Sequence, residues 1–226
     1  MQDQEHDPNR ILRVFQTKTQ TKSFYDRIST VYDVLAEGAE EPVRSAALDK
    51  LAARPGETVL EVGFGTGHSL KVMASAVGPH GCVIGLDLSE GMADRARATL
   101  ANHSVLQSVG LVCGDGAQMP LRDAMVDAIS MTFTLELFDT PEIPVVLAEC
   151  RRVLKRSGRM VIASLAKDEH DLGSNVMEWT HLHFPNFANC RPIFVRRPVV
   201  SAGFVIHNVE RARIWLPVDI VLATVR

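Results

Sequence analysis

Three glycines at alternate positions follow a short apolar run in the first third of the chain. The run is Thr58–Leu60, and residues 61–67 read Glu-Val-Gly-Phe-Gly-Thr-Gly. Glycine accepts a positive φ and lets a ligand approach the main chain closely. A helix that starts near Gly67 would present unpaired backbone N–H groups to an anionic group. The pattern therefore predicts a strand-to-helix turn that holds a nucleotide-like ligand.

The spacing of these glycines separates two classes of nucleotide site. The dinucleotide fingerprint is G-x-G-x-x-G/A, and its third small residue falls here on His68, which disfavours a nicotinamide-dependent oxidoreductase. Asp87 ends the next apolar run, 20 residues beyond Gly67, at a place where a carboxylate accepts hydrogen bonds from both ribose hydroxyls. NAD enzymes carry an acid there too, and a surface carboxylate before a helix is the alternative. Together with the glycine spacing, Asp87 favours a nucleoside ligand.

Short apolar runs alternate with helical patterns after Pro55-Gly56, as in an α/β fold. Runs that are apolar throughout, such as 160–163, suit parallel strands covered on both faces. The connections are long enough for right-handed crossovers. We expect strands at 57–62, 82–87, 109–113, 126–132 and 158–165, then at 204–206 and 214–225. We expect helices near 67–77, 89–102, 141–155 and 192–202, two leading helices within 24–53, and a loop and irregular stretch over 167–190.

Length and composition suit a single soluble domain. The chain has 226 residues, 46% hydrophobic and 23% charged, and a net charge of −3 argues against a nucleic-acid partner. No apolar run approaches the roughly 18 to 20 residues of a transmembrane helix, and the start lacks the order of a signal peptide, so we expect a cytoplasmic protein. We expect a mobile N-terminal arm at 1–22 and one domain at 23–226, with lid elements at 23–53 and 166–190.

The glycine turn with its leading acid resembles the cofactor loop of class I S-adenosylmethionine-dependent methyltransferases. Within that class the chain is similar to the small-molecule group that includes ubiquinone/menaquinone C-methyltransferases and phospholipid N-methyltransferases. The segments that carry this resemblance are Phe24–Ile28 with Tyr32-Asp33, Val59–Gly63, Gly85–Ser89 and Arg152–Lys155. The resemblance implies a Rossmann-like, seven-stranded, mostly parallel sheet with helices on both faces and an antiparallel terminal strand pair.

The resemblance also implies roles for individual residues. Asp115 would accept the adenine amine, with a simple Asp-Gly turn as the alternative, and Glu61 would organise the methionine end, unless it is a buried acid bonded only to backbone. Tyr25 and Tyr32 would fold over the cofactor or pack in the core. The expected cofactor contacts are Tyr25, Tyr32, Glu61, Gly63, Phe64, Gly65, Thr66, Gly67, Asp87, Leu88, Met92, Asp115, Gly116, Ala117 and Thr132. The implied cofactor is S-adenosylmethionine, with S-adenosylhomocysteine as product.

The methyl acceptor is less well indicated. Quinone C-methylases usually carry an Arg-Asn pair after the fourth strand, where this chain reads Thr134-Leu-Glu-Leu137, and the Asn/Asp-Pro-Pro-Tyr word of amine methylation on nucleobases or glutamine is missing. Aromatic residues around Trp179, Phe184 and Phe187 favour an apolar lipid or quinone-like acceptor. A polar metabolite, or a non-catalytic cofactor-binding subunit, is the alternative. A homodimer through the N-terminal arm stays open.

Methyl transfer from a sulfonium needs positioning more than acid–base chemistry. Where the acceptor must lose a proton, the candidates are Glu136, His181 and His183. The two histidines, with Glu178, could instead bind a metal or be ordinary packed or surface residues, and no dense ligand cluster accompanies them. The four cysteines form no C-x-x-C pair and suit small buried positions. We therefore expect no metal.

Overall fold

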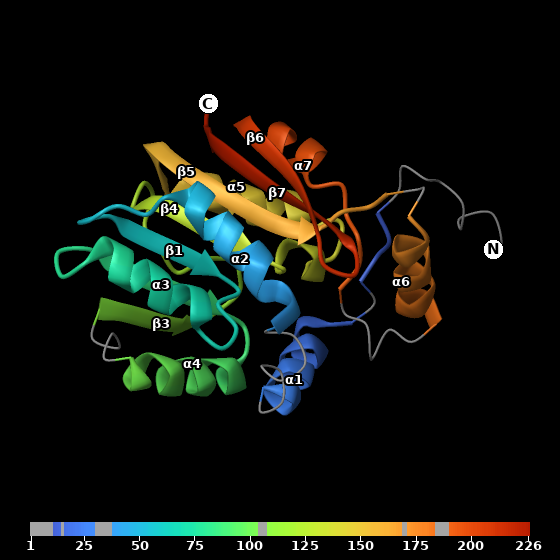
Figure 1. The fold of residues 1–226 in the computed structure, drawn as a ribbon, viewed down its shortest axis with the longest axis horizontal. Coiled ribbons are helices and arrows are strands. Elements are labelled where there is room, and N and C mark those ends of the chain that lie inside the picture. Colours follow the sequence, from blue (N-terminus) through green and yellow to red (C-terminus); the bar gives the residue numbers. More distant parts are fainter. Residues whose placement is uncertain (1–10, 15, 30–37, 104–107, 169–170, 184–189) are drawn as a thin grey trace.

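A seven-stranded sheet forms the centre of the molecule in the computed structural model, which describes residues 11–14, 16–29, 38–103, 108–168, 171–183 and 190–226. The strand order is β3-β2-β1-β4-β5-β7-β6. Neighbours from β3 to β5 pair in parallel, and β7 runs antiparallel to both β5 and β6 (Figure 1). The strands are β1 Thr58–Val62, β2 Cys82–Asp87, β3 Val109–Cys113, β4 Val126–Thr132, β5 Leu154–Leu165, β6 Phe204–Arg213 and β7 Pro217–Val225. The expected fold class is confirmed.

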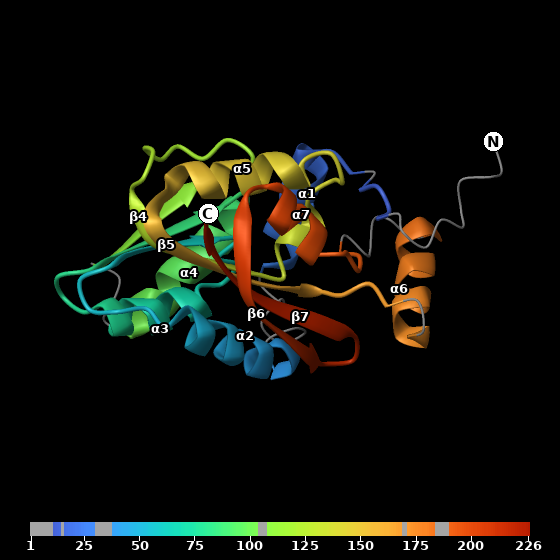
Figure 2. The same cartoon turned by 90° about the horizontal axis from the view of Figure 1, so that it is seen from above.

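Helices cover both faces of this sheet (Figure 2). One face carries α2 Gly38–Leu51, α3 His68–Val77 and α4 Glu90–Asn102, and the other carries α5 Ile143–Val153 and α7 Arg196–Ser201. Alternate residues of a strand point to opposite faces. Val59 accordingly packs in the core below α2 and α3, and its neighbour Leu60 packs in the core below α5. Burial on both faces explains why these strands are apolar throughout their length.

The order of the strands places a crevice at one edge of the sheet. β1 lies between β2 and β4, and the chain leaves β1 and β4 toward opposite halves of the sheet. In open α/β sheets such a switch point, at the carboxyl ends of the strands, is where ligands bind. The glycine turn of residues 63–67 lies at this point, directly after β1.

Two helices differ from the sequence expectation. α1 spans Lys18–Ile28 and so begins before Phe24, because Thr17 and Gln20 form a capping box there. α6 spans Leu172–His183, where we expected a loop and an irregular stretch, so that prediction was wrong. α6 stands apart from the sheet (Figure 1), and its Val176 and Trp179 are exposed. Its sequence has apolar residues at helical spacing, but Val176 and Trp179 do not pack on the sheet.

Candidate active site

A cavity opens at the carboxyl ends of β1, β2, β3 and β4, where the switch point lies. Its wall contains residues of the glycine turn, of the strand ends and of the N-terminal segment. The lining residues are Val14, Gln16, Lys18, Thr21, Tyr25, Glu40, Arg44, Glu61, Val62, Gly63, Phe64, Gly65, Thr66, His68, Ser69, Leu86, Asp87, Leu88, Met92, Gly114, Asp115, Gly116, Thr132, Phe133, Thr134, Leu137, Phe138, Asp139 and Glu142. Most of the expected cofactor contacts are therefore brought together.

The glycine turn has the geometry that its sequence predicts. Gly63 and Gly65 have φ values of 74° and 52°, and Gly67 (φ 88°) is the N-cap of α3. A Cβ on Gly63 would lie 2.2 Å from Thr134 Oγ1, so there is no space for a side chain at this position. The positive φ of Gly63 also disfavours any residue other than glycine. Gly63 and Gly65 line the cavity, so a ligand there can approach the main chain of the turn.

Asp87 holds the turn in place. The Gly65 N–H donates to its Oδ2 at 2.9 Å, and the Ser89 N–H donates to its Oδ1 at 2.9 Å. Burial raises the pKa of Asp87, and these backbone hydrogen bonds act in the opposite direction. The carboxylate lines the cavity while it fixes the loops on either side of it.

Glu61 is a buried acid with capacity for a ligand. Its carboxyl is fully buried, burial raises its pKa to about 8, and a hydrogen bond from Ser69 opposes the shift. Its Oε2 is buried and has no hydrogen-bond partner in the described part of the chain. A buried oxygen without a partner costs free energy unless a ligand supplies a donor. An ammonium group, such as that of a methionine moiety, is a suitable donor.

Asp115 follows β3, which is separated by β2 from the strand β1 that carries Glu61. Its Oδ1 accepts from the Ala117 N–H at 2.9 Å, and Lys18 Nζ lies 2.5 Å from its Oδ2. Lys18 also forms an ion pair with Glu142 at 2.6 Å. The expected partner of Asp115, an adenine amine, would therefore share this carboxylate with Lys18.

The end of β4 is strained where it meets the cavity. Phe133 has a φ of 52°, which a bulky side chain rarely adopts, and its N–H donates to the Ala163 carbonyl at 2.8 Å. Thr132 Oγ1 is buried without a partner in the described residues. Strained residues and unpaired polar atoms are both typical of ligand sites.

Several expected site residues lie elsewhere. Gly67 and Ala117 do not line the cavity, although both adjoin residues that do. Tyr32 lies outside the described residues, as do Phe184 and Phe187.

None of the three candidate acid–base residues lines the cavity. Glu136 is buried below it, where it accepts hydrogen bonds from Ser164 Oγ (2.9 Å) and the Leu165 N–H (3.1 Å). His181 is buried on α6 and donates through Nε2 to the Arg13 carbonyl at 3.0 Å. His183 is exposed on the same helix and stacks on Trp179, with 4.6 Å between ring centroids. The structure therefore does not bring these three side chains together.

The N-terminal strap, which we define as residues 11–14 and 16–18, closes one side of the cavity. The Arg13 guanidinium donates to both oxygens of Asp139 at 2.6 to 2.9 Å, and the Val14 N–H donates to the same carboxylate at 2.9 Å. Burial alone would raise the pKa of Asp139, but the hydrogen bonds from Arg13, Val14 and Thr140 lower it. The strap is thereby joined to the loop that follows β4.

Arg191 also connects the N-terminal strap to the loop that follows β4. Its side chain is fully buried and donates to the carbonyl groups of Leu12 (2.6 Å), Glu136 and Phe138 (2.8 Å). Burial lowers the pKa of Arg191 to about 10, although Asp139 and Glu136 act in the opposite direction. Arg191 thus has a structural position, and we find it neither in the cavity wall nor at a basic surface turn.

Sequence reasoning missed the charged residues that reach the cavity from α1, α2 and the loop after β4. These are Lys18, Glu40, Arg44, Asp139 and Glu142. None of them belongs to a motif of fixed spacing, so only tertiary packing reveals them. Among the described residues we find no group of three or more side chains that could hold a metal ion, and no helix long and apolar enough to cross a membrane.

Comparison with known proteins agrees with this geometry. Residues 59–158 match the family model of the methyltransferase domain. A nocamycin O-methyltransferase from Saccharothrix syringae is 35% identical over 136 residues, which are 60% of this chain and 48% of the relative. Residues 59–158 therefore form a methyltransferase domain. The glycine turn, Glu61 and Asp87 all lie within these residues.

Further relatives extend the comparison. A demethylmenaquinone methyltransferase from Symbiobacterium thermophilum is 31% identical over 150 residues, 65% of this chain and 59% of the relative. A crystal structure of an S-adenosylmethionine-dependent methyltransferase from Aquifex aeolicus has a TM-score of 0.61 and 22% identity, and covers 93% of this chain and 100% of that one. The chain spans about half the length of the curated relatives it matches. The expected methyltransferase family and fold are confirmed.

Proposed function

We propose that the protein transfers the methyl group of S-adenosylmethionine to a small acceptor molecule, with a lipid or quinone-like acceptor favoured. The observation that carries the proposal is the placing of three carboxylates around one glycine turn. Glu61, Asp87 and Asp115 lie at or beyond the carboxyl ends of β1, β2 and β3, and all three line the cavity. They suit the ammonium, ribose and adenine groups of the cofactor in that order along the cavity.

The chemistry of the cofactor requires little of the protein beyond positioning. S-adenosylmethionine supplies an activated methyl group on a sulfonium. The glycine turn, Asp87 and Thr132 would hold the cofactor in the cavity, and the N-terminal strap would exclude water from it. Alignment of an attacking atom about 3 to 3.5 Å from the methyl carbon is then a large part of the catalysis.

Apolar side chains in the cavity wall support an apolar acceptor. Val14, Phe133 and Leu137 are among the lining residues. A demethylmenaquinone methyltransferase is among the relatives, which is in keeping with a quinone-like acceptor. A polar metabolite, or cofactor binding without methyl transfer, is the alternative.

Incubation with methyl-labelled S-adenosylmethionine and an extract of the source cells tests the proposal. We expect protein-dependent label in the organic phase after extraction. Label in new aqueous products would overturn the lipid or quinone preference but keep the methyl transfer. Tight binding of S-adenosylhomocysteine without labelled product would favour the binding-protein alternative. The Asp87→Asn variant is a suitable negative control, because it removes the charge and keeps only one of the two oxygens that accept the Gly65 and Ser89 N–H groups.

A further inference from the structure

The carboxyl side chains that line the cavity differ in their bonding. Asp87, Asp115 and Asp139 accept backbone N–H groups, Glu142 pairs with Lys18, and Glu61 accepts a hydrogen bond from Ser69. The remaining one is Glu40, in the first turn of α2. It has no hydrogen bond or ion pair within the described part of the chain. A partly buried carboxyl that lines a cavity in this condition is typical of a functional site.

The direction of α2 places Glu40 on the side of the cavity away from the adenosine. α2 packs against β4, β5 and β7. The carbonyl at its last residue, Leu51, accepts a hydrogen bond from Arg159, which lies in the first half of β5. The first turn of α2 must therefore lie toward the other end of β5, at the carboxyl edge of the sheet. Asp87 and Asp115 follow β2 and β3, on the opposite side of the glycine turn.

The charged surroundings of Glu40 agree with this position. Arg44 lies one turn further along α2, Glu136 follows β4, and Cys190 precedes the buried Arg191. All three interact electrostatically with Glu40. We expect an acceptor to approach the sulfonium from this side, because the opposite side carries the residues suited to ribose and adenine. Glu40 is thus a carboxyl without a hydrogen-bond partner in the described residues, on the acceptor side of the cavity.

We propose that Glu40 is the general base that removes a proton from the acceptor, and that the acceptor attacks through a hydroxyl, an amine or another atom bearing an acidic proton. This inference rests on the proposed methyl transfer. The acceptor X–H gives its proton to the Glu40 carboxylate while X forms a bond to the methyl carbon. The carbon–sulfur bond breaks and its electron pair stays on sulfur, which becomes the neutral thioether. Glu40 then returns its proton to solvent.

The protonation state of Glu40 suits this role. Burial raises its pKa to about 7, while Arg44 lowers it and Glu136 raises it further. A general base works best when its pKa lies near the operating pH. Because the base must be ionised, transfer should increase as the pH rises through about 7 and fall away below it.

Replacement of one carboxyl oxygen tests the proposal. We expect Glu40→Gln to lower label transfer from S-adenosylmethionine to the extract acceptor by about 100-fold or more. Its affinity for S-adenosylhomocysteine in calorimetry should stay within about twofold, because Glu40 lies away from the residues suited to the adenosine. The increase of transfer with pH should disappear in Glu40→Gln and persist in Glu40→Asp.

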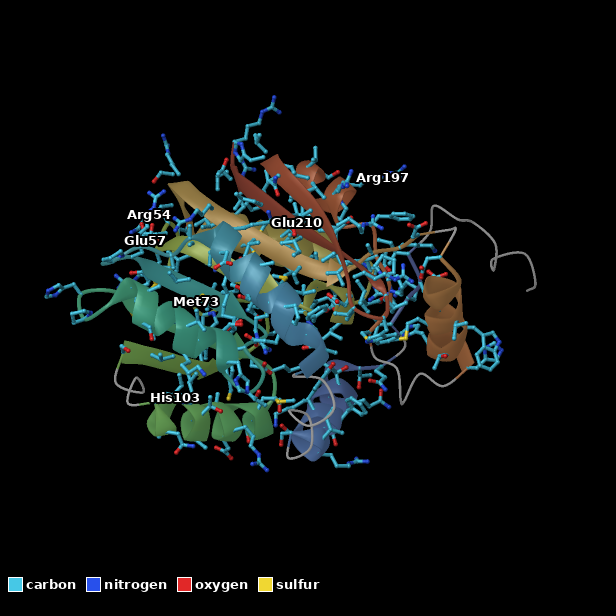
Figure 3. The ribbon with its side chains drawn as sticks, in the orientation of Figure 1. Arg54, Glu57, Met73, His103, Arg197 and Glu210 are labelled. Carbon is cyan, nitrogen blue, oxygen red and sulfur yellow. The ribbon has the colours of Figure 1, made fainter. Side chains whose placement is uncertain are left out.

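Glu210→Gln is a matched control. Glu210 lies on β6 (Figure 3), where it forms an ion pair with Lys50 at the far end of the same helix α2. The Glu210→Gln variant should transfer label at the same rate as the unaltered protein. Full transfer by Glu40→Gln, with its pH dependence retained, would overturn the inference. A joint loss of S-adenosylhomocysteine affinity would also overturn it, by making Glu40 a cofactor ligand. A parent protein that transfers no label would instead overturn the proposed function.

Discussion

Asp87 combines a structural and a ligand-binding position in one side chain. It fixes the glycine turn through the Gly65 and Ser89 N–H groups and faces the cavity where a ribose would lie. We predict that Asp87→Ala weakens S-adenosylmethionine binding by roughly 1.5 to 3 kcal/mol, because charged hydrogen bonds to the ribose and the order of the turn are lost together. Calorimetry measures the change. Asp94→Ala, on the exposed face of α4, is the control, and an unaltered affinity in Asp87→Ala would refute the ribose role.

Individual site residues could be predicted from the sequence only where a motif fixes their place. Glu61 and Asp87 were found because each has a set position relative to a strand end and the glycine turn. Glu40 and Lys18 reach the same cavity from helices that no motif ties to it. His181 shows the converse, because its place near a proposed lid suggested chemistry, whereas its ring is buried against the Arg13 carbonyl.

The first two glycines of the turn differ in how tightly they are packed. Gly63 has a φ of 74° and no space for a methyl group beside Thr134, whereas Gly65 has a φ of 52° and open space. We predict that Gly63→Ala lowers the free energy of unfolding by more than the roughly 1 to 2 kcal/mol of backbone strain expected for Gly65→Ala. Denaturant unfolding of both variants measures this. Gly110→Ala, with open space and an ordinary φ, is the control. Equal losses at Gly63 and Gly65 would contradict the prediction.

Whole elements were predictable where helices cover both faces of the sheet and the strands are therefore apolar throughout. The strands β1 to β4 match their expected bounds within a residue, since apolar runs between glycine and proline signals are covered on both faces. α6 was missed because it follows the polar segment at Lys167-Asp168 and because Val176 and Trp179 are exposed. The capping box at Thr17 was present in the sequence and would have given the start of α1.

At the scale of the whole molecule, buried acids should make stability depend on pH. Burial raises the pKa of Glu61 to about 8 and of Glu136 to about 7, far above an unfolded value near ~4.3. The native state therefore keeps protons that the unfolded chain has released. Stability should be highest near pH 5 and fall as the pH rises to about 8, by at most ~1.4 kcal/mol per pH unit for each group.

Thermal unfolding of the ligand-free protein at pH 5, 6.5 and 8 measures this dependence. Below pH 5 the trend reverses, because hydrogen bonds lower the pKa values of Asp127 and Asp139 and their contribution is lost on protonation. Glu136→Gln does not titrate, so it should flatten the slope. Its single oxygen can accept from the Leu165 N–H, and its amide group can donate to Ser164 Oγ. A midpoint that rises from pH 5 to pH 8 would be the contrary result.

The way in which Arg191 binds the N-terminal strap affects whether substitutions at the contacting positions are correlated. Its acceptors are main-chain carbonyls at residues 12, 136 and 138, and every amino acid offers that group. Side chains at these positions can change without loss of the contact, so substitutions there need no compensating change at residue 191. Methods that infer contacts from correlated substitutions would therefore not detect the contact between Arg191 and Leu12, although these residues are 179 positions apart in the chain.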